Sequence, residues 1–228
     1  MTTAAPQRRE AGEGVLSRGA LAVYHVLVYQ GLLLLTASPG IALLLTLRAD
    51  ASNLPLAALA AVPLGPALAA TLFAWRRALQ EPSLQPARHF WRGYRLNALP
   101  VLAWWVPALG LATVLGINAT GAGAVPGGEV LGAIAVVLLV LLLLVAANAL
   151  VITALYSLRT RDVLRLAAYY IVRSPRTTVA TLALAVVIGG SLVFLSELVP
   201  ILTGTLLALA LLHGARPIRS DIEENFVS

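Results

Sequence analysis

The chain has 228 residues, of which 59% are hydrophobic and only 11% are charged. A soluble domain usually has about 25% charged residues, so this composition excludes a soluble fold and indicates an integral membrane protein. All 16 basic residues are arginine and the formal net charge is +6. Cysteine is absent, which excludes disulfides, thiolate catalysis and cysteine-ligated metals.

Runs of apolar residues divide the chain into six candidate membrane spans. An α-helix crosses about 30 Å of hydrocarbon with about 20 residues. We therefore predict an all-α, polytopic transmembrane bundle in one domain over 20–215, between an N-terminal tail at 1–19 and a C-terminal tail at 216–228. The spans are placed at about 20–47, 54–75, 97–117, 130–156, 176–195 and 199–215. The last range is short and begins at Pro200, so five spans plus a re-entrant segment are the alternative.

Arginines are concentrated in alternate connections between these spans, as the positive-inside rule requires of the cytoplasmic face. Of the 16 arginines, all except Arg48 fall in the two tails or in the connections at 76–95 and 159–176. The pattern predicts a multi-pass protein of the plasma or inner membrane with both termini in the cytoplasm. The same charges are expected to contact anionic lipid of the cytoplasmic leaflet, and their distribution does not suggest a nucleic-acid partner.

Proline and glycine interrupt the first two apolar runs, at Pro39-Gly40 and at Pro63, Gly65 and Pro66. Each proline removes a backbone hydrogen bond and can break a helix. Transporters use such breaks to present backbone groups to a solute, so these residues form a candidate solute path. In many membrane helices, however, proline and glycine only kink or pack the helix, and both interpretations stay open.

Other polar chemistry inside the spans is sparse. No Asp, Glu, Arg or His lies near the middle of a predicted span, which disfavours a proton- or sodium-coupled pump. The polar residues that remain in the spans are expected to form hydrogen bonds between helices: Asn148, Thr153, Thr181, Thr203 and Thr205. Because the sequence contains no H-x-x-x-H motif, carboxylate pair, phosphate-binding glycine loop or nucleophile elbow, we expect neither an enzyme nor a bound metal or cofactor.

The stretch 65–97 carries the densest side-chain chemistry of the chain. Its arginines after residue 87 recur at i, i+4 and i+7, on one face of a helix, while Phe90 and Tyr94 fall on the opposite face. A short helix of this kind is typical of a membrane surface, and arginine mixed with aromatic residues is also typical of protein interfaces. The candidate lipid- or partner-contact residues here are Arg76, Arg77, Arg88, Phe90, Trp91, Arg92, Tyr94, Arg95 and Asn97.

A second amphipathic helix is predicted between the fourth and fifth spans. Arg161 and Arg165 fall on one side of it, with Val163 and Tyr170 broadly opposite, and Pro175 limits it at its end. We expect this helix to lie at the cytoplasmic surface. Its two arginines join the candidate contact residues.

The segments PLGPALAATLFAWRRAL and PARHFWRGYRLNAL, at 63–79 and 86–99, resemble the YesL family (domain of unknown function 624). Members of that family typically show a Gly-Pro-Ala ending to a span, then an arginine pair, then an aromatic-Arg-x-aromatic stretch that closes with Asn. The matching positions are Gly65, Pro66, Ala67, Ala70, Arg76, Phe90, Trp91, Arg92, Tyr94, Arg95 and Asn97. The resemblance implies a polytopic membrane protein without an established activity, in a family often associated with ABC-type carbohydrate uptake systems.

Two functional hypotheses follow from these observations. The first is a non-enzymatic accessory protein of carbohydrate uptake, whose basic and aromatic cytoplasmic loop docks a permease or ATPase subunit of an ABC transporter. The alternative is an autonomous facilitator or channel for a small solute, which would use the proline- and glycine-broken spans.

Overall fold

The computed structural model describes residues 15–48, 50–81, 84–124, 126–196, 198–218 and 221, apart from the side chains of Val15, Leu16 and Arg18. The elements in this part are all helical, which confirms the all-α prediction. They are α1 (Val15–Thr46), η1 (Ala51–Asn53), α2 (Leu54–Ala61), α3 (Leu64–Gln80), α4 (Pro86–Gly121), η2 (Ala122–Ala124), α5 (Gly128–Leu155), α6 (Thr160–Arg173), α7 (Pro175–Phe194) and α8 (Leu198–Gly214). The predicted N-terminal tail and most of the C-terminal tail lie outside the described residues.

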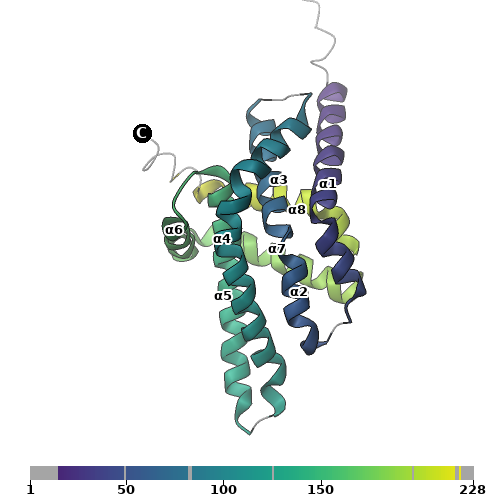
Figure 1. Cartoon of the computed structure of the whole chain (residues 1–228). Coiled ribbons are helices and arrows are strands. Elements are labelled where there is room, and N and C mark those ends of the chain that lie inside the picture. Colours follow the sequence, from purple (N-terminus) through teal and green to yellow (C-terminus); the bar gives the residue numbers. More distant parts are fainter. Residues whose placement is uncertain are drawn as a thin grey trace, which may run out of the picture.

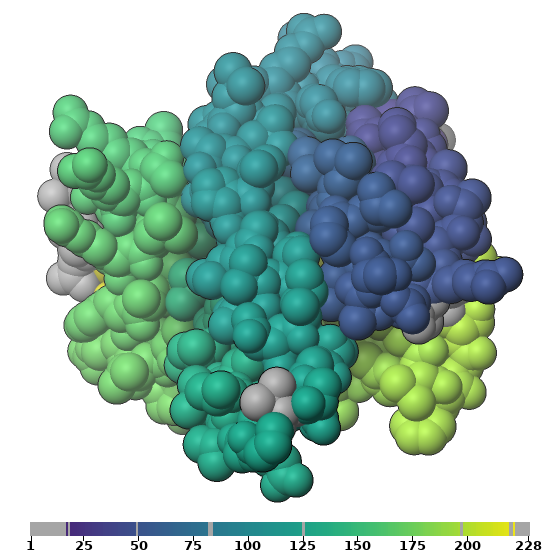
Figure 2. All heavy atoms as spheres, turned by 60° about the horizontal axis from the view of Figure 1, so that its bottom comes forward, coloured from purple at the N-terminus to yellow at the C-terminus, as the bar shows by residue number. Residues whose placement is uncertain are grey.

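The helices form a bundle in which α1 to α5 run up and down along one axis (Figure 1). The hairpin of α4 and α5 extends beyond the other helices at one end, while α7 and α8 run across the bundle behind them and α6 lies to one side. Figure 2 brings that end forward, with the tip of the α4–α5 hairpin at the lower centre, the early helices to its upper right and the green α6–α7 part to its left.

Four helices of the described chain are long and apolar enough to cross a membrane: Gly19–Thr46, Pro86–Ala124, Gly128–Leu155 and Pro175–Phe194. A fifth candidate span is the pair Ala51–Ala61 and Leu64–Gln80, which is bent by 43°. The sixth predicted span corresponds to α8, whose 17 residues give about 25 Å of helix against about 30 Å of hydrocarbon. The fold is therefore a polytopic bundle of four to five candidate spans plus a shorter apolar helix.

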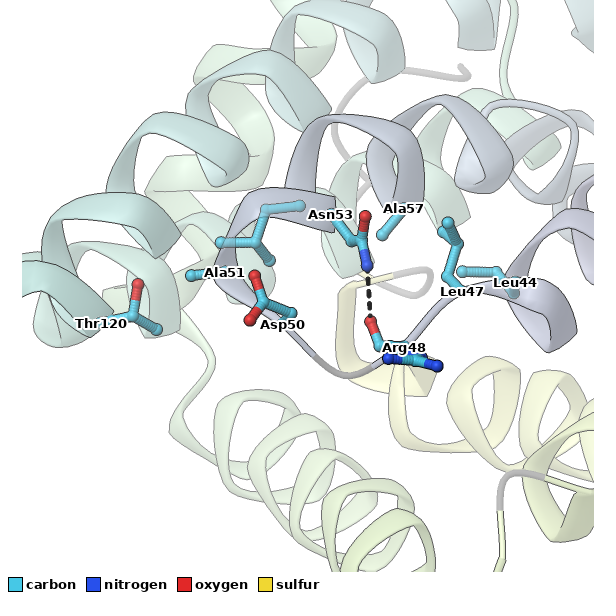
Figure 3. Close-up of a pocket in the computed structure, with 9 residues that line it drawn as sticks. Leu44, Leu47, Arg48, Asp50, Ala51, Asn53, Ala57 and Thr120 are labelled. Carbon is cyan, nitrogen blue, oxygen red and sulfur yellow. Dashed lines mark hydrogen bonds between the residues drawn. The ribbon is translucent and has the colours of Figure 1, made fainter.

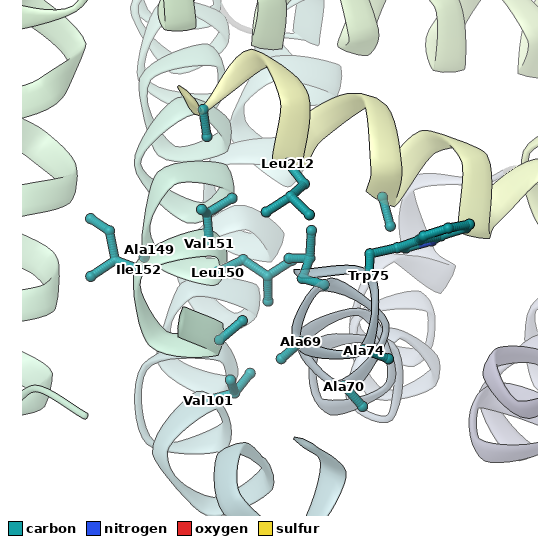
Figure 4. Close-up of a cluster of buried hydrophobic side chains, with 14 of the residues drawn as sticks. Ala69, Ala70, Ala74, Trp75, Val101, Ala149, Leu150, Val151, Ile152 and Leu212 are labelled. Carbon is teal, nitrogen blue, oxygen red and sulfur yellow. The ribbon is translucent and has the colours of Figure 1, made fainter. Parts of the chain in front are cut away.

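Helix α3 is the centre of the bundle, since it packs against α1, α4, α5 and α8. Its buried surface consists largely of alanine, including Ala69, Ala70 and Ala74 (Figure 4). Small side chains let helix backbones approach closely, which in a membrane favours association by van der Waals contact. Larger side chains of the surrounding helices, such as Val101 of α4 and Leu212 of α8, complete the core.

Of the two interpretations left open for Pro39-Gly40, a break in the first span does not occur, because α1 continues through Pro39. Proline has no N–H to donate to the carbonyl four residues earlier, which is that of Leu35. The Ser38 hydroxyl donates to the Leu35 carbonyl instead, at 2.8 Å. This side-chain hydrogen bond satisfies the carbonyl that proline leaves without its usual donor.

The short surface helix expected near residues 88–97 is also wrong as a separate element. It forms the first turns of α4, a continuous helix of 36 residues that begins with Pro86 in its first turn. Buried residues recur every three or four positions along it: Phe90, Gly93, Asn97, Val101 and Trp104. These buried residues all lie on one face of α4. The arginine-bearing first turns and the membrane-spanning part therefore pack against the same neighbours as one continuous helix.

The second predicted amphipathic helix is confirmed as α6. Val163, Ala167 and Tyr170 are buried, whereas Arg161 and Arg165 are exposed. The Asn148 side chain of α5 donates from Nδ2 to the Ala167 carbonyl at 3.1 Å and so ties α6 to α5.

Candidate arginine-rich contact site

The last turn of α3, the first turns of α4 and the end of α5 meet at one end of the bundle. Arg76 of α3 donates from Nη1 to the Leu155 carbonyl at 3.2 Å, and its guanidinium carbon lies 5.2 Å from the centroid of the Tyr156 ring. The connection that contains Arg48 lies at the opposite end (Figure 1). The arginines of the second and fourth connections are thus separated from Arg48 in space as well as in sequence.

The first turns of α4 carry an exposed arginine stripe, made of Arg88, Arg92 and Arg95. Within the described residues these three side chains form no ion pair or hydrogen bond. Trp91 lies beside them and is 39% exposed. The stripe therefore presents uncompensated positive charge next to an accessible aromatic ring.

Two residues predicted to belong to this contact surface do not reach it. Phe90 is fully buried and stacks against Tyr94, with 6.3 Å between ring centroids. Asn97 is 8% exposed, and its Nδ2 has no hydrogen-bond partner among the described residues. Both side chains lie on the face of α4 that packs into the bundle, so they support the stripe from behind.

A small cavity lies between the last turns of α3 and the end of α5. Its volume is about 290 Å³, and its lining residues are Phe73, Arg76, Arg77, Gln80 and Leu155. Arg77 is half-buried, with its guanidinium carbon 5.7 Å from the centroid of the Phe73 ring. No lining residue is acidic, so two guanidinium groups define the charge of this cavity.

The arginines of α6 form a separate set. Arg161 and Arg165 are exposed, as predicted, but α6 has its main contacts with α5 and few with α4. The predicted contact residues are therefore distributed over α3, α4 and α6.

The expected break in the second span is present between α2 and α3, at Pro63. The Trp105 indole N–H donates to the Ala61 carbonyl at 3.0 Å, so a backbone group next to the break is already bonded. Gly65 lies under the same ring, because a Cβ there would be 2.7 Å from Cδ1 of Trp105. Gly40 of α1 packs closely against Ala60, whose backbone carbonyl a Cβ at position 40 would overlap.

Pro66, the fifth residue of the candidate solute path, is buried in the first turn of α3. Pro39 is exposed on α1. The glycines of this set therefore allow neighbouring helices to pack closely. The five residues do not line a common opening.

A larger cavity of about 470 Å³ lies at the opposite end of the bundle (Figure 3). Its lining residues are Leu44, Leu47, Arg48, Asp50, Ala51, Asn53, Leu54, Ala57 and Thr120. The Asn53 side chain donates to the Arg48 carbonyl at 3.0 Å, which fixes part of the turn between α1 and α2. Hydrogen bonds from Ser52 hold the pKa of the Asp50 carboxyl below its usual value.

A partly buried polar cluster joins α1, α3 and α8. Gln30 donates to the Ile201 carbonyl at 2.7 Å and accepts from the Thr205 N–H at 2.9 Å. The Trp75 indole N–H lies 3.1 Å from the Thr205 carbonyl. The sequence analysis included Thr205 but missed Gln30, although Gln30 is the one glutamine within the six predicted spans.

The interhelical role expected of the polar span residues is confirmed for three of them. Besides Asn148 and Thr205, the Thr153 hydroxyl accepts from the Trp104 indole at 3.2 Å. The expectation is wrong for Thr203, whose hydroxyl donates within α8 to the Val199 carbonyl at 2.7 Å. Among the described residues no group of three His, Asp or Glu side chains lies close enough together to hold a metal ion.

These features define a polytopic helical membrane protein with an arginine-rich end. No protein-family model matches the chain, and the searches of curated proteins and of solved structures give no match either.

Proposed function

We propose that this protein is a non-enzymatic accessory component of a membrane transport system, which docks an acidic cytoplasmic surface of a partner through the arginine stripe of α4. The observation that carries the proposal is the exposure of Arg88, Arg92 and Arg95 on one helical face without an ion-pair partner in the described chain. Arginine beside an accessible tryptophan is the combination that is enriched at the centres of protein interfaces.

The rigidity of this surface supports docking. Because the stripe belongs to α4, a helix of 36 residues whose opposite face is buried, its side chains are presented by a fixed backbone. The Phe90 and Tyr94 rings stack behind the stripe and further restrict the motion of the helix turns that carry it. A preorganised surface loses less conformational entropy on binding than a flexible loop.

The resemblance of residues 63–99 to the YesL family suggests the partner class. We propose a permease or ATPase subunit of an ABC-type carbohydrate uptake system, with the arginine-rich end and both termini in the cytoplasm. The positive-inside distribution of the arginines supports this orientation.

The alternative function, a facilitator for small solutes, requires backbone groups that a solute can reach at the broken span. The Ala61 carbonyl is bonded to Trp105, and Gly40 and Gly65 are covered by neighbouring groups. These contacts favour a packing role for the prolines and glycines, so we place the docking function first.

The test is crosslinking in native membranes, followed by purification of the tagged protein in mild detergent and mass spectrometry of the recovered proteins. The double variant Arg92→Glu, Arg95→Glu should lower recovery of transporter subunits by about tenfold or more, since juxtaposed like charges cost several kcal/mol. Arg48→Glu, at the opposite end, is the matched control and should leave recovery unchanged. Wild-type recovery of the partner by the double variant, at equal membrane levels, would refute the docking surface.

A further inference from the structure

The cavity between α3 and α5 lies where the bent second span leaves the apolar part of the chain. Arg77 stands in the last turn of α3, which ends at Gln80, and Arg76 directly precedes it. If the bent pair of α2 and α3 crosses the bilayer, this end of α3 leaves the hydrocarbon layer and brings these side chains to headgroup depth.

Arg77 supplies an unpaired charge to this cavity. Its side chain is half-buried, and within the described residues it makes no hydrogen bond or ion pair. Its contact with the Phe73 ring is a cation–π interaction, which orients the guanidinium without neutralising it. A partly desolvated charge of this kind attracts an anion more strongly than a fully exposed one.

Arg76 is held in place on the other side of the cavity. It is bonded to the Leu155 carbonyl and lies over the Tyr156 ring, so its position is fixed by α5. A guanidinium has five N–H donors in a planar fork that matches the oxygens of a phosphate. Phe73 and Leu155 add apolar surface to the same cavity.

We infer that this cavity binds the phosphate group of an anionic phospholipid, with Arg77 as the main phosphate contact, Arg76 beside it, and the Phe73 and Leu155 side chains against the glycerol and upper acyl chain. The apolar walls distinguish this ligand from free phosphate, which has no apolar part to bury. This site is separate from the proposed docking stripe, so either proposal can fail without the other.

The test measures lipids that stay bound to the full chain. The tagged protein is placed in vesicles with equal amounts of phosphatidylglycerol and phosphatidylcholine, extracted in mild detergent and examined by native mass spectrometry. The wild type should retain phosphatidylglycerol preferentially. Arg77→Gln should reduce that retention by about tenfold, the loss expected for one charge-assisted hydrogen bond. Arg92→Gln removes the same charge from the exposed stripe and should leave retention within about twofold.

A second variant tests the cavity without removing a charge. Gln80 is exposed at the mouth, so Gln80→Trp should fold normally and hinder lipid entry, with a loss of phosphatidylglycerol similar to that of Arg77→Gln. Wild-type retention by the correctly folded Gln80→Trp or Arg77→Gln variant would overturn the inference. An equal loss of phosphatidylglycerol in Arg92→Gln would instead indicate diffuse attraction by the whole arginine-rich end. Displacement of the lipid by excess inorganic phosphate would indicate a site for free phosphate. Either result rejects the proposed lipid site.

Discussion

The carboxamide of Gln30 on α1 accepts a hydrogen bond from the backbone N–H of Thr205 on α8, at 2.9 Å. The same carboxamide donates to the carbonyl of Ile201 at 2.7 Å. Residues 201 and 205 are an i, i+4 pair, so the Gln30 side chain bridges two groups that pair with each other in a regular α-helix. A side chain inserted in this way joins α8 to α1 and is a recognised cause of local helix distortion.

Replacing Gln30 by leucine should therefore loosen the attachment of α8. Interhelical hydrogen bonds in membrane proteins contribute about 0.6 kcal/mol each on average, so the loss of two should destabilise the fold by about 1 kcal/mol. Gln30→Glu should cost more, because a carboxylate can accept from Thr205 but cannot donate to Ile201. Reversible unfolding in mixed micelles would measure both; equal stability of the wild type and Gln30→Leu would contradict the bridge.

Gly40 allows α1 to pass close to the bend between α2 and α3. A Cβ at position 40 would overlap the Ala60 backbone carbonyl and lie 2.8 Å from Cγ of Pro63. Backbone cannot move aside as a flexible side chain can, so Gly40→Ala should destabilise the protein by about 1–3 kcal/mol, the usual cost of overpacking. The measurement is the thermal unfolding temperature in detergent, with unfolding monitored by circular dichroism.

Gly31 provides a matched control on the same helix. It is exposed, and a Cβ there would meet nothing within 4 Å. Gly31→Ala should leave stability unchanged or raise it by up to about 1 kcal/mol, because alanine is the better helix former. If both alanine variants unfold at the same temperature, the close approach at Gly40 does not limit packing.

Tyr170 links α6 to the segment that follows α8, since its hydroxyl donates to Oδ2 of Asp221 at 2.7 Å. Burial raises the pKa of Tyr170 well above its ordinary value, and the hydrogen bond to Asp221 raises it further. The folded state therefore favours the neutral phenol. Its contribution to stability is fully present below the unfolded pKa of about 10 and is lost as pH rises from there through the folded pKa.

Tyr170→Phe should release the chain after α8 and weaken this alkaline dependence. We expect proteases to cut the C-terminal segment faster in the variant at neutral pH, by about fivefold if one hydrogen bond of about 1 kcal/mol is lost. Unfolding followed from pH 9 to pH 12 should show a smaller loss of stability in the variant than in the wild type. Parallel curves for the two proteins would show that Tyr170 ionisation does not contribute.

The sequence was sufficient for the helical class, for most span positions and for α6, because these depend on apolar run length and on the placement of Val163 and Tyr170 opposite the arginines. It could not decide whether α1 breaks or continues at Pro39, because proline occurs in both broken and continuous membrane helices. The structure shows a continuous helix, in which the Ser38 hydroxyl bonds to the Leu35 carbonyl.

The candidate site was predictable on its exposed side and less so on its buried side. Helical spacing correctly grouped Arg88, Arg92 and Arg95, but it placed Phe90 among contact residues because an aromatic ring suits an interface and a core equally. The Arg76–Leu155 contact joins residues 79 positions apart, and no local pattern encodes such a pair. Gln30 had a visible signal, since a lone glutamine in an apolar span needs a hydrogen-bond partner.

The absence of native cysteine makes the orientation of the bundle directly testable. Ala51 and Ser157 are exposed at opposite ends, in the turn after α1 and between α5 and α6. If the arginine-rich end is cytoplasmic, a membrane-impermeant maleimide added to intact cells should label Ala51→Cys but not Ser157→Cys. Permeabilised cells should label both, and the cysteine-free parent should give no signal. Labelling of Ser157→Cys alone in intact cells would show that the orientation is reversed. A cytoplasmic partner could then not reach the arginine stripe, so the docking proposal would fail, while the lipid proposal for the cavity between α3 and α5 would be unaffected.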